Sequence, residues 1–178
     1  MTQSIENPSR RRLFKGKIAQ PPSVPRLPWV INESTFTELC NQCGDCISVC
    51  ETSIIKKDES GLPFVDFSTD ECTFCGKCQE VCQQPLFLDK NTIESNQIQP
   101  WPGTITISNT CLAQNNIMCQ SCQDVCDTRA ISFSYKSSSI PEPTINLIDC
   151  NQCGACISTC PQQAITLNLG NNTEVAHV

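Results

Sequence analysis

Short apolar stretches recur along the chain, and their pattern predicts short strands rather than long helices. Three segments alternate apolar and polar residues with the two-residue period of a half-buried strand; they are 62–67, 104–107 and 144–147. Four further apolar stretches, three to five residues long, are 53–55, 85–88, 129–133 and 163–167. The pattern therefore predicts seven short strands.

One helix and two hairpin loops are predicted between these stretches. Thr35–Glu38 has the pattern of a capping box, in which Ser or Thr is followed three residues later by Glu, so a helix is expected there. Segments 56–61 and 135–143 separate predicted strands and contain clusters of turn-forming residues, which favours hairpin loops.

The composition leaves little apolar material for a conventional core. Leu, Ile, Val and Phe together make up 42 of the 178 residues, whereas cysteine alone accounts for 16. Something besides hydrophobic burial must therefore hold the fold together. No run of eighteen apolar residues is present, so no transmembrane helix is expected. His177 is the single histidine, which excludes histidine-based triads and zinc enzymes with two or three histidines, and no enzymatic activity is expected.

The cysteines form four groups of four. The first, second and fourth groups follow the pattern C-x2-C-x2-C-x3-C, and the third has a first gap of seven residues. In chain order the groups are Cys40, Cys43, Cys46, Cys50; Cys72, Cys75, Cys78, Cys82; Cys111, Cys119, Cys122, Cys126; and Cys150, Cys153, Cys156, Cys160.

This spacing is the ligand run of bacterial ferredoxins that bind [4Fe-4S] clusters. Three closely spaced cysteines reach three iron corners, and Gly44, Gly76 and Gly154 allow a close approach of the backbone after the second cysteine. The fourth cysteine is expected to begin a helix that leaves the loop and to ligate the neighbouring cluster, as in two-cluster ferredoxins. The four expected ligand sets are Cys40, Cys43, Cys46 with Cys82; Cys72, Cys75, Cys78 with Cys50; Cys111, Cys119, Cys122 with Cys160; and Cys150, Cys153, Cys156 with Cys126.

Disulfides and zinc are the two alternatives to iron–sulfur clusters for these cysteines. Disulfides suit small secreted chains, but no secretory signal is visible. Zinc is the stronger alternative because any C-x2-C pair can bind it, although structural zinc sites usually pair two such knuckles across a longer loop. Near the groups lie Phe74, Phe87 and Phe133, for which packing against a cluster and a role in electron tunnelling both remain open.

Internal similarity predicts a duplicated module. Residues 40–50 and 150–160 agree at nine of eleven positions. We expect an α+β fold of two tandem two-cluster ferredoxin-like modules, with short strands and helices around the clusters. The expected divisions are a basic, proline-rich arm at 1–30, modules at 31–99 and 100–170, and a tail at 171–178.

Charge is distributed unevenly along the chain. Residues 1–30 carry six basic residues and one acidic residue, whereas the rest carries six basic and seventeen acidic residues. An acidic body is not typical of a nucleic-acid-binding protein, and bound clusters would add negative charge that favours a basic partner surface. The arm contains Arg10, Arg11 and Arg12, which either dock a partner or form a solvated tail.

The segment Ser9–Lys15 is similar to the twin-arginine export consensus, but residues 16–26 lack an apolar core and a small-residue cleavage site. Export is therefore not expected, and the protein is assigned to the cytoplasm.

These features together resemble one family. They are the four groups in this order, the seven-residue gap with Cys111-Leu112-Ala113, Cys122-Gln123-Asp124, Ser9-Arg10-Arg11, and Pro28-Trp29 before the first group. The chain resembles the NapF family, the ferredoxin-type proteins of the periplasmic nitrate reductase system. The resemblance implies a cytoplasmic protein with four [4Fe-4S] clusters that contacts the precursor of the reductase catalytic subunit and assists its iron–sulfur maturation before export. The alternative is an electron-carrying ferredoxin that serves a reductase partner.

Overall fold

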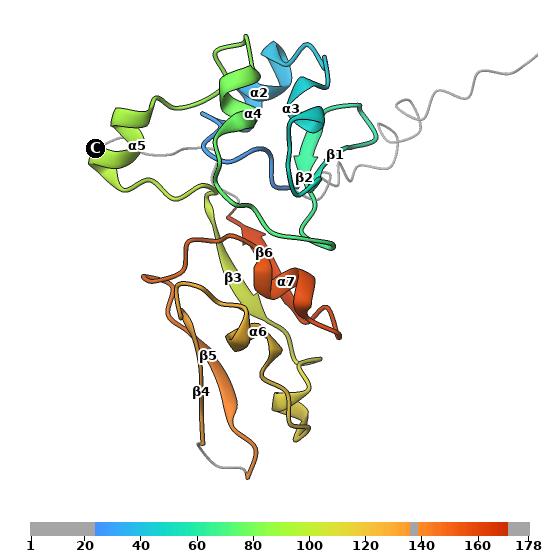
Figure 1. Ribbon diagram of the computed structural model, residues 1–178, viewed down its shortest axis with the longest axis vertical. Helices are drawn as coiled ribbons and strands as arrows, with labels where there is room; N and C mark the ends of the chain where they lie inside the picture. Colours follow the sequence, from blue (N-terminus) through green and yellow to red (C-terminus); the bar gives the residue numbers. More distant parts are fainter. Residues whose placement is uncertain (1–23, 136–138, 171–178) are drawn as a thin grey trace, which may run out of the picture.

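The computed structural model describes residues 24–135 and 139–170. Two modules are stacked along the long axis of the molecule (Figure 1). The first contains α2 (Glu33–Leu39), α3 (Asp45–Ser48), β1 (Ile55–Lys57), β2 (Pro63–Val65), α4 (Lys77–Val81) and α5 (Lys90–Asn96). The second contains β3 (Gly103–Ile107), the 3-10 turn η1 (Ala113–Asn115), α6 (Ser121–Asp124), β4 (Ile131–Ser134), β5 (Glu142–Ile145), α7 (Ala155–Thr159) and β6 (Ile165–Leu169).

Each module is built around an antiparallel hairpin and a pair of short helices. Strand β1 pairs with β2, and β4 pairs with β5. Helix α3 contacts α4, and α6 contacts α7. In the second module the first and last strands, β3 and β6, also pair, with Gly103 opposite Leu169. The first module has a single bridge in the corresponding place, between Val30 and Phe87.

Six of the seven predicted strand segments overlap an observed strand, and 85–88 contributes only the bridge at Phe87. Three strands begin two residues later than the apolar pattern indicated. The reason is that Ser53, Arg129 and Gln163 have left-handed backbones, with φ of 56°, 55° and 48°, and an extended strand begins only beyond such a residue.

The predicted helix before the first group is present, but its start was predicted wrongly. The N-cap is Asn32 rather than Thr35, because the Asn32 side-chain oxygen accepts a hydrogen bond from the backbone N–H of Thr35 at 2.8 Å. Helix α5 was not predicted at all. It lies near the end of the expected first module, where no element was predicted, and its N-cap Asp89 accepts from the N–H of Thr92 at 2.9 Å.

Residues 24–30, which the charge pattern assigned to the arm, pack against the first module. Leu27 is 2% exposed. The guanidinium of Arg26 donates to both carboxylate oxygens of Glu33 and to Asp58 at 2.7 Å, and it lies over the ring of Phe36. The indole N–H of Trp101 donates to the carbonyl of Arg26 at 2.8 Å. Arg26 is therefore a structural residue that joins three segments of the chain.

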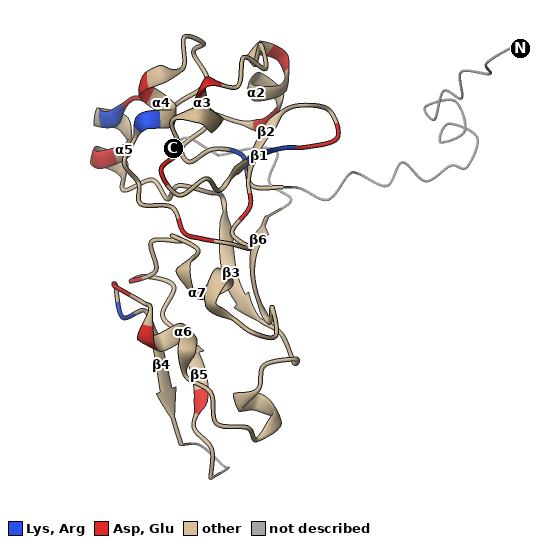
Figure 2. Ribbon diagram, turned by 45° about the vertical axis from the view of Figure 1, so that its right-hand side comes forward, with Lys and Arg blue, Asp and Glu red and all other residues tan. Residues whose placement is uncertain are grey.

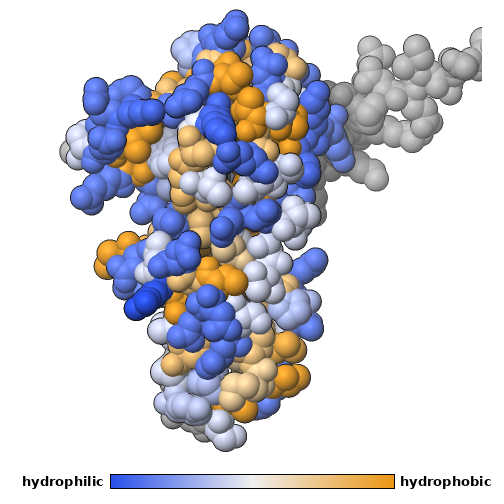
Figure 3. All heavy atoms as spheres, in the orientation of Figure 1, coloured by the Kyte–Doolittle hydropathy of each residue, from blue (hydrophilic) through white to orange (hydrophobic). Residues whose placement is uncertain are grey.

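The surfaces of the two modules differ in charge. Residues 31–99 contain twelve acidic and four basic residues, whereas residues 100–170 contain four acidic and two basic residues. Acidic segments accordingly mark the first module in Figure 2, and most of the second is uncharged. Apolar residues appear on the surfaces of both modules (Figure 3), and the second module exposes Ile117, Met118, Leu147 and Ile148.

Candidate metal centres

The three regular cysteine groups form similar loops. In each, the residue two positions after the first cysteine is left-handed, with φ of 58° at Gln42, 54° at Phe74 and 63° at Gln152. The glycine after the second cysteine is also left-handed, with φ between 76° and 89°. A side chain strains this conformation, which explains the glycines. Two left-handed residues so close together make each loop turn sharply.

The expectation that the fourth cysteine begins a helix was wrong. Helices α3, α4 and α7 begin directly after the left-handed glycine and contain the third cysteine. The fourth cysteine lies beyond the helix, and Cys82 and Cys160 have extended backbones. The helix therefore lies inside the ligand run, and the chain leaves the helix at the fourth cysteine.

In the first module, thiols of two groups lie together. Burial raises the pKa of Cys46 to about 11, and the neighbouring thiols that add to this effect are Cys43, Cys40 and Cys82. Burial also raises the pKa of Cys72 to about 11, with Cys50 and Cys75 among its neighbours. Each fourth cysteine therefore lies near the other group, which is the arrangement that crossed ligation requires.

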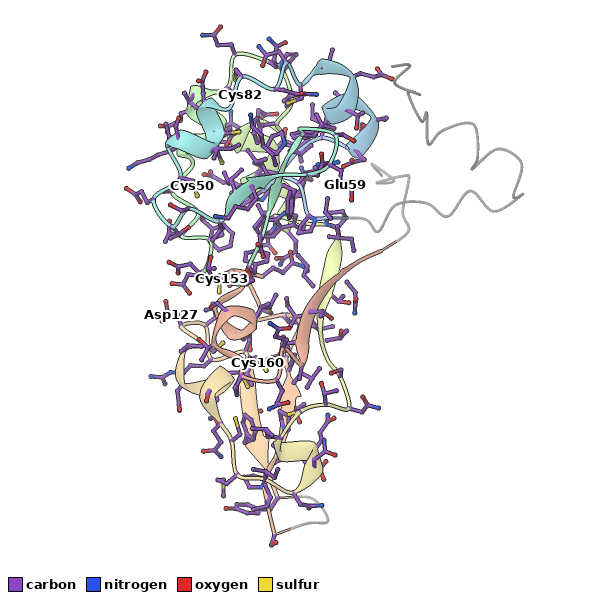
Figure 4. The ribbon with its side chains drawn as sticks, turned by 90° about the vertical axis from the view of Figure 1, so that its right-hand side faces the viewer. Cys50, Glu59, Cys82, Asp127, Cys153 and Cys160 are labelled. Carbon is purple, nitrogen blue, oxygen red and sulfur yellow. The ribbon has the colours of Figure 1, made fainter. Side chains whose placement is uncertain are left out.

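The second module repeats this exchange. Burial raises the pKa of Cys122 to about 11, and the neighbouring thiols include Cys111, Cys119 and Cys160. Burial raises the pKa of Cys150 as well, with Cys126 as the neighbouring thiol. Figure 4 shows Cys153 toward the first module and Cys160 further along the second.

Two cavities are lined by the thiols of expected ligand sets. The first-module cavity is bordered by Leu27, Phe36 and Phe87 and by five cysteines, which are Cys40, Cys43, Cys46, Cys82 and Cys78. The second-module cavity is bordered by Leu112 and Phe133 and by four cysteines, which are Cys111, Cys119, Cys122 and Cys160. A cavity that gathers thiols from separate loops and has apolar walls fits a thiolate-bound cluster shielded from water.

The chemistry of the donors also fits iron–sulfur binding. All sixteen cysteines lie in the described ranges, and every one is a free thiol without a disulfide. Burial and mutual repulsion disfavour several thiolates in one place unless a positively charged group binds them. Within residues 24–135 and 139–170, no three His, Cys, Asp or Glu side chains are grouped to hold one metal ion. A cluster presents four iron corners, one to each thiolate, and so spans more space than a single ion.

The third group is built differently from the others. Its longer first gap folds into η1, closed by the Asn115 side chain, which donates to the carbonyl oxygens of Asn109 at 2.7 Å and Cys111 at 2.8 Å. Ile117 and Met118 follow and are 52% and 58% exposed. Gln120 stands where the regular groups have left-handed glycine, and its φ is −135°. The extra length is thus an ordered turn that leads into an exposed apolar pair beside Cys119.

The three phenylalanines near the groups have different surroundings. Phe87 and Phe133 line the two cavities. Phe74 instead packs against Trp29 and Trp101, with ring centroids 5.6 Å and 6.3 Å apart.

Sequence reasoning missed the role of the asparagine and glutamine in the repeated Cys-Asn-Gln-Cys-Gly motif. The side-chain oxygens of Asn41 and Asn151 accept from the N–H of the second cysteine of their groups, each at 3.2 Å. Gln152 is 6% exposed; it accepts from the N–H of Trp101 at 3.2 Å and donates to the carbonyl of Gly103 at 2.6 Å. The repetition of the motif was the signal that could have identified these residues.

Known proteins resemble the chain over most of its length. The 4Fe-4S dicluster domain family matches residues 39–84 and again 117–165. Over 175 residues the chain is 41% identical to the ferredoxin-type protein NapF of Haemophilus influenzae, and the alignment covers 93% of this chain and 96% of that protein. Over 158 residues it is 37% identical to the ferredoxin-type protein NapF of Escherichia coli K12, covering 89% and 93%.

Two further sequence predictions concern membrane insertion and the basic arm. Among the described helices, none is both long and apolar enough to cross a bilayer. Arg10, Arg11 and Arg12, the predicted docking residues, lie outside the described residues.

Proposed function

The chain belongs to the NapF family of ferredoxin-type iron–sulfur proteins, and on this premise we propose that it holds four [4Fe-4S] clusters and assists the maturation of a reductase. The sixteen cysteines supply the ligands, with the fourth cysteine of each group crossing to the other group of its module. Such clusters supply one-electron redox chemistry at thiolate-bound iron. The protein's own residues supply four thiolates to each cluster, exclude water and form the surfaces that partners contact.

The residues around the proposed sites differ, and this supports different roles for them. In the first module, Leu27 and Phe36 are almost fully buried where they line the cavity. In the second module, the loop that leads to Cys119 exposes Ile117 and Met118. The third-group cysteines are themselves partly buried, so the exposure lies in the loop beside the site rather than at its ligands.

The observation that carries the maturation role is the third group. Among the four groups it is the one without the left-handed glycine, and the exposed Ile117 and Met118 directly precede its Cys119. Here we treat the cluster of this group as cargo rather than as a resident cofactor. A donor needs one site that releases its cargo while the others retain theirs, and apolar residues at its edge would be covered by the acceptor protein.

We expect the third site to lose iron to a chelator several-fold faster than the other three. The anaerobically purified protein is incubated with an iron chelator, and freed cysteines are alkylated and quantified by mass spectrometry. Alkylation of Cys119 should precede that of Cys43 and Cys75. Removing residues 115–118 should slow the loss of iron. The variant Ile117→Gln with Met118→Gln keeps the loop length, so comparing the two variants separates the effect of loop length from that of apolar exposure. Equal rates at all four sites would remove the basis of the donor role.

The proposed acceptor is the precursor of the catalytic subunit of the periplasmic nitrate reductase, in the cytoplasm, before export. The family resemblance supports this choice. The twelve acidic residues of 31–99 favour a basic partner surface, and Arg10, Arg11 and Arg12 are proposed to dock an acidic one.

A second candidate function is electron transfer to a reductase partner without an assembly role. It is favoured by the closeness of the two groups within each module, where the Cys78 thiol neighbours Cys46 and the Cys156 thiol neighbours Cys122.

The two functions differ in what the reductase contains when this protein is missing. If the protein matures the reductase, we expect the catalytic subunit from cells lacking it to contain less iron and sulfide than the subunit from complemented cells. If it only carries electrons, the cluster content should be unchanged while the rate of reduction falls. Iron and sulfide counts on the purified catalytic subunit decide between them.

A further inference from the structure

The two modules meet at their ligand loops. The backbone N–H of Cys72, the first cysteine of the second group, donates a 2.8 Å hydrogen bond to the carbonyl oxygen of Cys153 in the fourth group. The thiol of Cys153 also lies near the thiol of Cys72, and the Glu71 carboxylate lies near the thiol of Cys153. A ligand cysteine of one module therefore contacts a ligand cysteine of the other directly.

A tight apolar contact supports this hydrogen bond. The ring of Phe67 lies so close to Gly154 that a Cβ added to the glycine would overlap the ring atoms. Phe67 is 5% exposed and packs edge-to-face on Trp101, with centroids 5.3 Å apart. Trp101 is fixed in turn by Arg26 and Gln152. Because such close packing leaves no room for sliding, the two ligand loops are held in one arrangement.

The order of the cysteine groups in space differs from their order in the sequence. Within the modules, the first group neighbours the second and the fourth neighbours the third. Across the junction, the second group contacts the fourth rather than the third, which follows it in the chain. Figure 4 shows the labelled cysteines Cys82, Cys50, Cys153 and Cys160 following one another along the molecule.

We propose that the Cys72–Cys153 junction joins the two modules into one electron path, which runs through the first, second and fourth groups and ends at the third group for as long as its cluster is in place. This rests on the proposed binding of four clusters. A low-potential one-electron donor protein at one end is oxidised, and an acceptor protein at the other end is reduced by the same electron. No bond is made or broken, and no proton moves.

The ends of this path differ in chemistry, so that they suit different partners. The first group lies in the acidic module, and the third group lies beside the exposed Ile117 and Met118. If the modules acted separately, each would need its own donor and acceptor. The junction removes that need, because an electron received by the acidic module reaches the apolar end without leaving the protein.

The test uses magnetic coupling in the full-length protein. The anaerobic protein is reduced with dithionite, and electron paramagnetic resonance spectra are recorded for the wild type, Cys78→Ala and the control Cys43→Ala. In the wild type, we expect the second-group cluster to broaden the signals of the second module across the junction. Cys78→Ala removes a second-group ligand and should abolish this broadening. Cys43→Ala, which removes a first-group ligand, should leave that broadening in place.

The reciprocal pair guards against a variant that fails to fold. Cys153→Ala changes a ligand at the junction and should remove the coupling from the signals of the first module. Its control, Cys119→Ala, changes a ligand away from the junction and should leave that coupling in place. Iron and sulfide are counted on the same samples. Full cluster content with no coupling across the junction would overturn the electron path alone. Wild-type protein without iron at the second or fourth group would overturn both the path and the cluster assignment on which it rests.

Discussion

Replacing Cys82 with serine is expected to damage the site built on Cys40, Cys43 and Cys46 while leaving the site built on Cys72 intact. The sequence places Cys82 in the second group, but its thiol lies beside Cys46 and lines the first-group cavity. Losing one thiolate should cost about four iron and four sulfide ions per chain, because the whole cluster depends on its four ligands.

Alkylation identifies which site was lost. Cys43 and Cys75 are the exposed cysteines of their groups, so each is modified readily once its cluster is gone. Mass spectrometry of Cys82→Ser should show Cys43 alkylated and Cys75 protected. The matched variant Cys50→Ser should show the reverse. If Cys82→Ser exposes Cys75 and protects Cys43, each group holds its own fourth cysteine and the crossed assignment is wrong.

Gly154→Ala is expected to be the most destabilising of the glycine substitutions in the cysteine loops. Gly154 and Gly76 have similar left-handed backbones, with φ of 89° and 76°. Alanine at either position costs about 1–2 kcal/mol for the conformation alone. At Gly154 the new methyl group would also overlap the Phe67 ring, whereas at Gly76 the nearest atom is a Glu80 carboxylate oxygen 4.0 Å away. Overpacking of this kind adds about 1–3 kcal/mol.

The measurement is the rate at which the visible absorbance bleaches in guanidinium chloride under anaerobic conditions, since such proteins unfold irreversibly. Gly154→Ala should bleach about tenfold faster than Gly76→Ala, because about 1.4 kcal/mol corresponds to a factor of ten. Combining Gly154→Ala with Phe67→Leu should recover part of the loss. Equal bleaching of the two single variants would show that the Phe67 contact does not hold the modules together.

The local parts of the fold followed from the sequence because local forces determine them. Cysteine spacing and glycine positions predicted tight loops, and apolar stretches predicted strands at nearly the right places. The errors are also local and have physical causes. Strands begin late at Ser53, Arg129 and Gln163 because of left-handed backbones, and α2 begins early because Asn32 caps it.

The arrangement of the modules could not be predicted in the same way. The pairing of β3 with β6 joins residues that are 58 to 66 positions apart in the sequence, and nothing in either strand alone specifies its partner. The junction likewise depends on Phe67 meeting Gly154 and on buried Gln152, whose counterpart Gln42 is exposed although the two motifs are nearly identical. Equal local sequences acquire different roles once the modules are stacked.

The pairing of β3 with β6 has a consequence for how such a chain arises. It brings the two ends of the second module to one place, where the N–H of Gly170 donates to the carbonyl of Pro102 at 3.0 Å. A unit whose ends meet can be appended to another unit, or cut away from it, through a single short connection without rethreading its interior. Duplication and fusion of such a unit therefore require only one new connection, and its exposed loops can diverge without disturbing the pairing of β3 with β6.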